Sequence, residues 1–102
     1  MASDEGQKVF FLKKDMGLSH REFFASLATL AREVSCRVSD SSAVLEYDSG
    51  EVPISLGPES QRQLGLMKLP QTWVSLEFRN LSEAQRTLFL ERFDLAFRRG
   101  GG

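Results

Sequence analysis

The sequence predicts an α+β protein, a two-layer sandwich in which two helices cover one face of a mostly antiparallel sheet of four to six strands. Apolar residues recur at helical spacing near residues 19–34 and again over 81–99, and between these segments they alternate with a period of two. The expected order is β-α-β-β-β-(β)-β-α. Two amphipathic helices in so short a chain must share the apolar face of one sheet.

Residues 8–13 form a β-branched and aromatic run that is apolar at both parities. A run of this kind is typical of an interior strand with both faces covered. We therefore expect it at the centre of the sheet, with Val9 and Phe11 facing the helices. A turn over residues 15–17 follows.

The first helix is predicted from its N-terminal signal and its apolar stripe. Ser19 and Glu22 have the spacing of a capping box, in which each side chain takes up an orphan amide of the other residue. The helix is expected to end at Val34 or Ser35. Its stripe consists of Phe23, Leu27, Leu30 and Val34.

Three short alternating runs, 36–38, 43–47 and 52–56, are separated by polar turns and predict an antiparallel meander with one apolar face. Pro53 has the outward parity of the third run. Because proline cannot donate to a strand ladder, we expect this strand at an edge of the sheet.

Gly57 and Pro58 break the pattern, and residues 59–63 are predicted to be a polar connection. Residues 64–69 leave two alternatives, a short strand or a segment that lines the sheet before Pro70. Residues 72–79 alternate clearly and predict a strand whose inward side chains are Val74, Leu76 and Phe78.

The last helix is predicted over residues 81–99. Ser82 and Gln85 have capping-box spacing, and Gly100 is expected to end the helix as its C′ residue. Arg86 falls on the apolar side of the first turn. The apolar stripe, which we expect to meet the first helix over the sheet, contains Phe89, Phe93, Ala96 and Phe97.

Composition limits the classes of function. A chain of 102 residues, 41% hydrophobic, fits one domain, and we expect a disordered tail over 1–7, a domain over 8–99 and a flexible glycine tail over 100–102. A formal charge of −1 gives no overall attraction to polyanions, so we predict no nucleic-acid partner. No run approaches the roughly 20 apolar residues of a membrane span. We expect a cytoplasmic protein without a membrane partner.

Cys36 is the only cysteine and His20 the only histidine, which excludes an internal disulfide and the usual zinc or iron–sulfur ligand sets. Cys36 is expected to be an inert core residue and His20 a structural one. With no nucleotide loop or catalytic constellation, we predict no enzyme activity, cofactor or metal. The sequence does not indicate an oligomeric state.

Two resemblances bear on fold and function. The element order is similar to the β-α-β4-α repeat of the TATA-binding-protein-like fold, as a likeness of topology. The C-terminal Arg-Arg-Gly-Gly-Gly resembles the tails of ubiquitin-like and sulfur-carrier proteins, which implies that Gly101 and Gly102 would be adenylated and then conjugated or thiocarboxylated. The alternative is a glycine helix cap. We favour the cap, because those carriers have a β-grasp fold whose tail leaves a strand.

The leading hypothesis is a small protein-binding module, with a carrier or an accessory subunit of a larger enzyme as alternatives. Trp73 has outward parity, and an exposed large aromatic on an uncovered sheet face can anchor an interface. The competing interpretation is that a bulge or residues 64–69 bury it. The other interaction candidates are Arg79, Glu46, Asp48, Arg92 and Arg99, although pairing with helix acids competes for the arginines.

Overall fold

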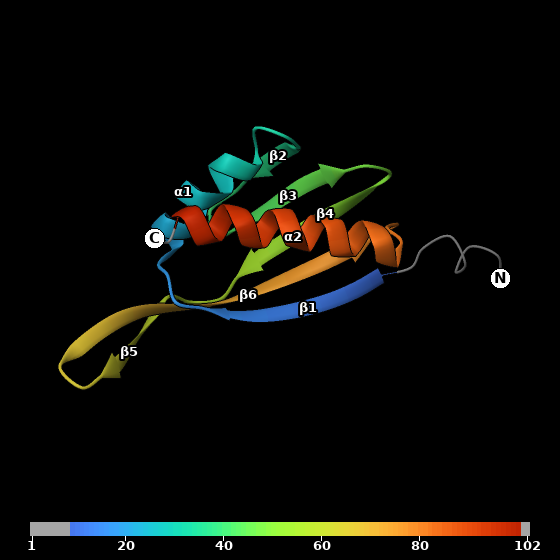
Figure 1. The fold of residues 1–102 in the computed structure, drawn as a ribbon. Helices are drawn as coiled ribbons and strands as arrows, with labels where there is room; N and C mark the ends of the chain where they lie inside the picture. Colours follow the sequence, from blue (N-terminus) through green and yellow to red (C-terminus); the bar gives the residue numbers. More distant parts are fainter. Residues whose placement is uncertain (1–8, 101–102) are drawn as a thin grey trace.

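The computed structural model describes residues 9–100, and the side chains of residues 9–98. It contains a six-stranded antiparallel sheet and two helices, which confirms the predicted α+β class. Both helices lie on one face of the twisted sheet, and one hairpin projects from the body (Figure 1). The elements are β1 (Val9–Met16), α1 (His20–Leu30), β2 (Ser35–Val38), β3 (Ser42–Tyr47), β4 (Gly50–Leu56), β5 (Ser60–Leu64), β6 (Met67–Arg79) and α2 (Glu83–Gly100).

The strand order is β1-β6-β4-β3-β2, so the prediction that the first strand is central is wrong: β1 is an edge strand. Val9 and Phe11, predicted to face the helices, instead lie on the opposite face, where they are 41% and 76% exposed. Their register partners are Arg79 and Glu77. Because the run is apolar at both parities, its pattern could not indicate which residues face the helices.

The prediction of an edge position for Pro53 is also wrong, since β4 lies between β6 and β3. In the ladder between β4 and β6, Glu51 pairs with Arg79 and the next pair is Ile54 with Leu76. The residues between these two pairs are not paired across the strands. Pro53 falls in this gap of the ladder. An interior strand can therefore hold a residue that has no N–H to donate.

Between β4 and β5 the register shifts by one residue. Leu56 pairs with Val74 and Ser60 with Gln71, so one strand advances four residues while β6 advances three. The extra residue forms a β-bulge at residues 57–59. The expected polar connection over 59–63 is therefore mostly strand β5, and β6 begins at Met67 rather than at Thr72.

Helix α1 begins as predicted, because Ser19 and Glu22 form both bonds of a capping box. It ends at Leu30, however, and not at Val34 or Ser35. The Arg32 and Glu33 amides donate to carbonyls three residues back, which tightens the chain into turns before β2.

Helix α2 likewise begins with the predicted capping box between Ser82 and Gln85. It continues through Gly100, so Gly100 lies inside the helix and is not the residue that follows it. Within residues 9–100, neither helix is long and apolar enough to span a membrane.

The core lies between the helices and the sheet, where the two predicted apolar stripes meet. Phe23, Phe89 and Phe93 have no exposed surface. The rings of Phe93 and Phe97 stack with centroids 4.3 Å apart, and Phe23 lies 4.9 Å from Phe97. The stripes cover buried sheet residues that include Val74, Leu76 and Phe78.

Arg86 also has a structural role on this side of the sheet. Its guanidinium lies 3.5 Å from the centroid of the Phe10 ring and donates to the Leu81 carbonyl. A cation over an aromatic face is a favourable contact, and the long side chain shields the ring from water. This explains why an arginine occupies the apolar side of α2.

Candidate functional site

The face of the sheet opposite α1 and α2 is not covered by any element of the described structure (Figure 1). We call it the open face. Directly paired residues of neighbouring strands point to the same side, so the register identifies its members. They are Val9, Phe11, Lys13, Asp15, Ser35, Arg37, Ser42, Val44, Glu46, Glu51, Pro53, Ser55, Trp73, Ser75, Glu77 and Arg79.

Small hydroxyl residues run across the middle of the open face. Ser75 pairs with Ser55, and Ser55 pairs with Ser42, so three serines form a row perpendicular to the strands. Larger side chains stand on either side of this row, with Trp73 on one side and Phe11 on the other, both substantially exposed. The row of serines therefore separates the two exposed aromatic residues.

At one end of the sheet, residues 60–71 form a projecting two-stranded hairpin, which we call the arm (Figure 1). Its loop is the pair Gly65 and Leu66, and Gly65 has a φ of 61°. In a type II′ hairpin turn, the first of the two loop residues has a positive φ and is usually glycine. Gly65 occupies this position. The loop places Leu66 at the tip, where its side chain is fully exposed, with Leu64 and Met67 more than half exposed beside it.

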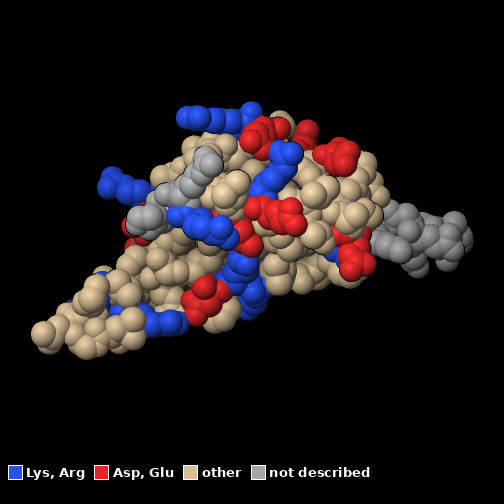
Figure 2. Space-filling model, in the orientation of Figure 1, with Lys and Arg blue, Asp and Glu red and all other residues tan. Residues whose placement is uncertain are grey.

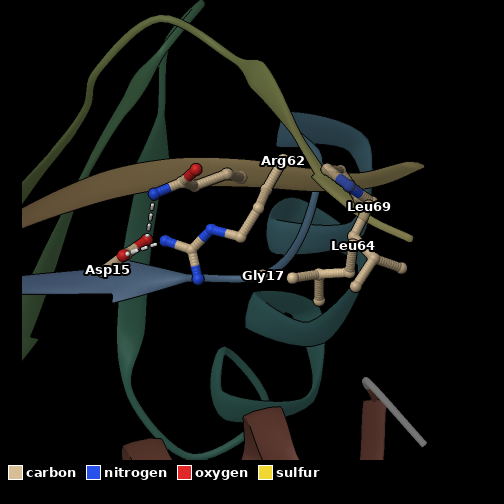
Figure 3. A pocket seen from close by; sticks show the side chains of 7 residues that line it. Asp15, Gly17, Arg62, Leu64 and Leu69 are labelled. Carbon is tan, nitrogen blue, oxygen red and sulfur yellow. Dashed lines mark hydrogen bonds and ion pairs between the residues drawn. The ribbon is translucent and has the colours of Figure 1, made fainter. Parts of the chain in front are cut away.

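The arm is tied to the end of β1 by polar contacts. The Asp15 carboxylate accepts from Arg62 of β5 at 2.8 Å and from Gln71 of β6 at 2.8 Å. Figure 3 shows Arg62 reaching from the arm to Asp15, while Leu64 and Leu69 line the same hollow of about 100 Å³. These bonds hold the arm in a defined direction relative to the body.

The arm continues the open face. Along β6, Met67, Leu69 and Trp73 have the same parity, and the register places Leu64 opposite Met67. The Lys13 ammonium lies 6.0 Å from the centroid of the Trp73 ring. We call Leu64, Met67, Leu69 and Trp73 the apolar strip; it runs from the tip of the arm onto the sheet.

The far end of the open face carries charged residues beside Val9 and Phe11. Arg79 donates to Glu77 at 2.5 Å and lies 3.6 Å from Glu51. The hydrogen bond to Glu77, together with the charges of both carboxylates, raises the pKa of Arg79 above its ordinary value. Arg79 therefore stays cationic and is already engaged by two acids.

The structure brings together some of the predicted interaction residues and separates others. Trp73, Arg79 and Glu46 share the open face. Asp48 lies in the β3–β4 turn, where it accepts from Gln85 at 2.9 Å, and Arg92 pairs with Glu33 in the helical layer. The side chain of Arg99, together with Gly101 and Gly102, lies outside the described residues.

Sequence reasoning missed the exposed residues of the arm and of β1. The sequence pattern predicts that Phe11 lies in the core, and it is compatible with either a strand or a segment lining the sheet for Leu64, Leu66 and Met67. One signal was present, because a two-residue loop that begins with glycine between apolar residues is typical of a hairpin. Pro70 obscured it, since a proline argues against a continuous strand.

His20 and Cys36 have structural surroundings. The His20 Nε2 atom lies 2.7 Å from the Gly57 carbonyl oxygen, so this nitrogen donates and links α1 to the β4–β5 bulge. Cys36 is half-buried, and burial raises the pKa of its thiol. Among the residues with described positions, no group of three His, Cys, Asp or Glu is placed to hold a metal ion.

Comparison of the chain with protein-family models, with curated proteins and with solved structures found no match. The basis for a functional assignment is therefore the surface itself.

Proposed function

We propose that the protein is a non-enzymatic protein-binding domain that engages its partner through the open face and the arm. The observation that carries this proposal is the exposure of large apolar side chains outside a completed core. Trp73 is 49% exposed and Leu66 is fully exposed, although the helices already bury a full aromatic core on the other face. An exposed apolar patch, such as the one formed by Leu64, Leu66 and Met67 at the tip of the arm, marks an interaction site.

The residue types also suit an interface. Aromatic anchors surrounded by polar residues are typical binding hot spots, and Trp73 has serines on one side and Lys13 over its ring. Burying a side chain as large as that of Trp73 or Phe11 contributes roughly 2–3 kcal/mol. A few such residues supply enough energy for specific association.

The test is affinity capture from a lysate of the source cells with three forms of the chain. The wild type is compared with Phe11→Ser/Trp73→Ser on the open face and with Leu88→Ser/Leu95→Ser on the outer side of α2. The two leucines are a matched control, because they are about half exposed but lie in the helical layer.

We expect the wild type and the α2 control to capture the same protein and the open-face variant to lose it. The melting temperature of each form shows that all three are folded. Retention of the captured protein by a folded open-face variant would contradict the proposal.

A further inference from the structure

We infer that the occupant of the apolar strip is an acidic amphipathic helix of a partner protein, lying along β6 from Trp73 to the tip of the arm. This inference rests on the proposed function and specifies the chemistry of the partner. It follows from the backbone pairing, the dimensions and the charges of the strip.

The backbone pairing favours a helix. Trp73 lies on the face of the sheet, where the strands already use their amides and carbonyls to pair with one another. A segment that lands on a sheet face receives few main-chain hydrogen bonds from it, so it must satisfy its own backbone groups. A helix does this, as α1 and α2 do on the opposite face of the same sheet.

Addition of a strand to the arm at its β6 edge is disfavoured by Pro70. The Gly57 amide donates to the Trp73 carbonyl, so the backbone groups of Trp73 point towards β4. Successive residues of a strand alternate between the two edges, which directs Pro70 to the free edge on the β1 side. A proline there removes a donor from that edge and blocks regular pairing.

The dimensions suit a helix of moderate length. Trp73 and Met67 are six residues apart on β6, a span of about 20 Å at strand spacing. An α-helix covers this distance with about 13 residues. Apolar side chains at helical spacing along one side of such a segment would cover Trp73, Leu69 and Met67 in turn.

The charges indicate that the helix is acidic. The arm carries Arg62 and Lys68 and no acidic residue, and in Figure 2 it is tan and blue. Arg62 lies on the side of the arm that carries the strip, as does Lys13 over Trp73, whereas Lys68 has the opposite parity. Among the described residues, the only acid beside the strip is Asp15, whose carboxylate already accepts from Arg62 and Gln71. With Lys13 and Arg62 against Asp15, this side of the surface has a net positive charge, and an apolar stripe flanked by Glu or Asp is complementary to it.

The test is selection of a library of random 16-residue peptides displayed on phage. The library is selected on the full chain and counter-selected on Trp73→Ser. Enriched peptides are synthesised with a fluorescent label, and the anisotropy of the label is followed while each form of the chain is added. Circular dichroism of each complex reports whether the bound peptide is helical.

We expect enriched sequences with apolar residues at spacings of three and four, an excess of Glu and Asp, and a gain of helical signal on binding. Leu66→Asp and Trp73→Ser should each weaken binding about tenfold or more. Leu88→Ser, on α2, should leave the affinity unchanged. Raising the salt concentration should weaken binding, because charged flanks contribute to it.

Four outcomes would overturn the inference. Peptides that depend on Trp73 but are basic, or that bind as strands with a period of two, would disprove the acidic helix while leaving the proposed function intact. The inference would also be rejected if no peptide that depends on Trp73 were enriched. The proposed function is tested separately, and it would be rejected if the open-face variant captured the same protein from the lysate as the wild type. Concentration-dependent dimerisation that buries Trp73 would identify a second copy as the occupant instead.

Discussion

The two faces of this sheet differ in what their side chains contact. Residues of β6 alternate between them: Val74 and Leu76 have no exposed surface under the helices, whereas Trp73, between Thr72 and Val74, is half exposed on the other side. The helix-covered face contains the aromatic core. The open face combines serines, ion pairs and isolated large apolar residues.

This difference indicates that the two faces have separate roles. The covered face already buries Phe23, Phe89 and Phe93 completely, which provides the main hydrophobic stabilisation of a chain of this size. Folding does not require Trp73 or Leu66 to be apolar. Under the proposed function, their apolar side chains contact a partner, and substitutions on the two faces should have different consequences.

The largest expected effect comes from the covered face. Phe93→Ala removes a ring that is fully buried and stacked on Phe97, and it should reduce the free energy of unfolding by about 3–5 kcal/mol. Trp73→Ser should change it by less than about 1 kcal/mol. Urea denaturation of both variants measures the difference, and equal losses of stability would abolish the distinction between the faces.

A smaller loss is expected where the sheet meets the start of α2. A Cβ atom at Gly50 would lie 2.0 Å from the Arg79 carbonyl oxygen and 2.8 Å from that of Asn80, so the backbone must shift. Gly50→Ala should cost about 1–3 kcal/mol. Gly17→Ala is the control, because its nearest neighbour would be 3.8 Å away. Similar melting temperatures for the two variants would show that the close contact at Gly50 is absent.

The body of this fold could be predicted from the sequence because its signals are local. Both capping boxes and both aromatic stripes are fixed by residues three or four apart, and the meander has a clear period of two. The position of β1 and the orientation of Phe11 were mispredicted. They depend on pairing with β6, whose paired residues are 56 to 70 positions away, and a run that is apolar at both parities carries no information about this pairing.

The arm was missed for a related reason. Its strands depend on a bulge at residues 57–59 that shifts the register, and bulges have no strong sequence signal in a stretch containing Gly57 and Pro58. The Asp15 contacts that fix its direction join residues more than forty positions apart. Of the residues of the apolar strip, the sequence predicts exposure only for Trp73. The strict alternation of residues 72–79 indicates that its side chain points away from the helices.

A still smaller effect is expected at the base of the arm. Asp15→Asn removes the ion pair with Arg62, which is partly exposed and contributes about 0.2–1 kcal/mol to global stability. The arm itself should become more mobile, because an amide keeps only one of the two oxygens that accept from Arg62 and Gln71. Hydrogen exchange should accelerate within residues 60–71 and stay unchanged in β3. Uniform acceleration throughout the sheet would show that the arm is not an independent unit.

The least perturbing probe is the thiol of Cys36, which packs beside the core on the covered face. Burial raises its pKa, so less thiolate is present near pH 8 than for a free cysteine, and alkylation by iodoacetamide should be slower. The rate should increase as the pH rises further. Because the folded state holds the thiol proton more tightly than the unfolded state, the free energy of unfolding should decrease as the pH rises through the pKa of Cys36. Equal rates in buffer and in urea would place Cys36 outside the covered region.

The most direct test of the distinction between the two faces is quenching of the Trp73 fluorescence by acrylamide in the isolated protein. Trp73 is the only tryptophan, so the signal reports one position on the open face. The expected result is efficient quenching in the folded chain, with a large decrease once a captured partner is bound. Weak quenching of the folded chain alone would show that the open face is already covered and would contradict its assignment as the binding surface.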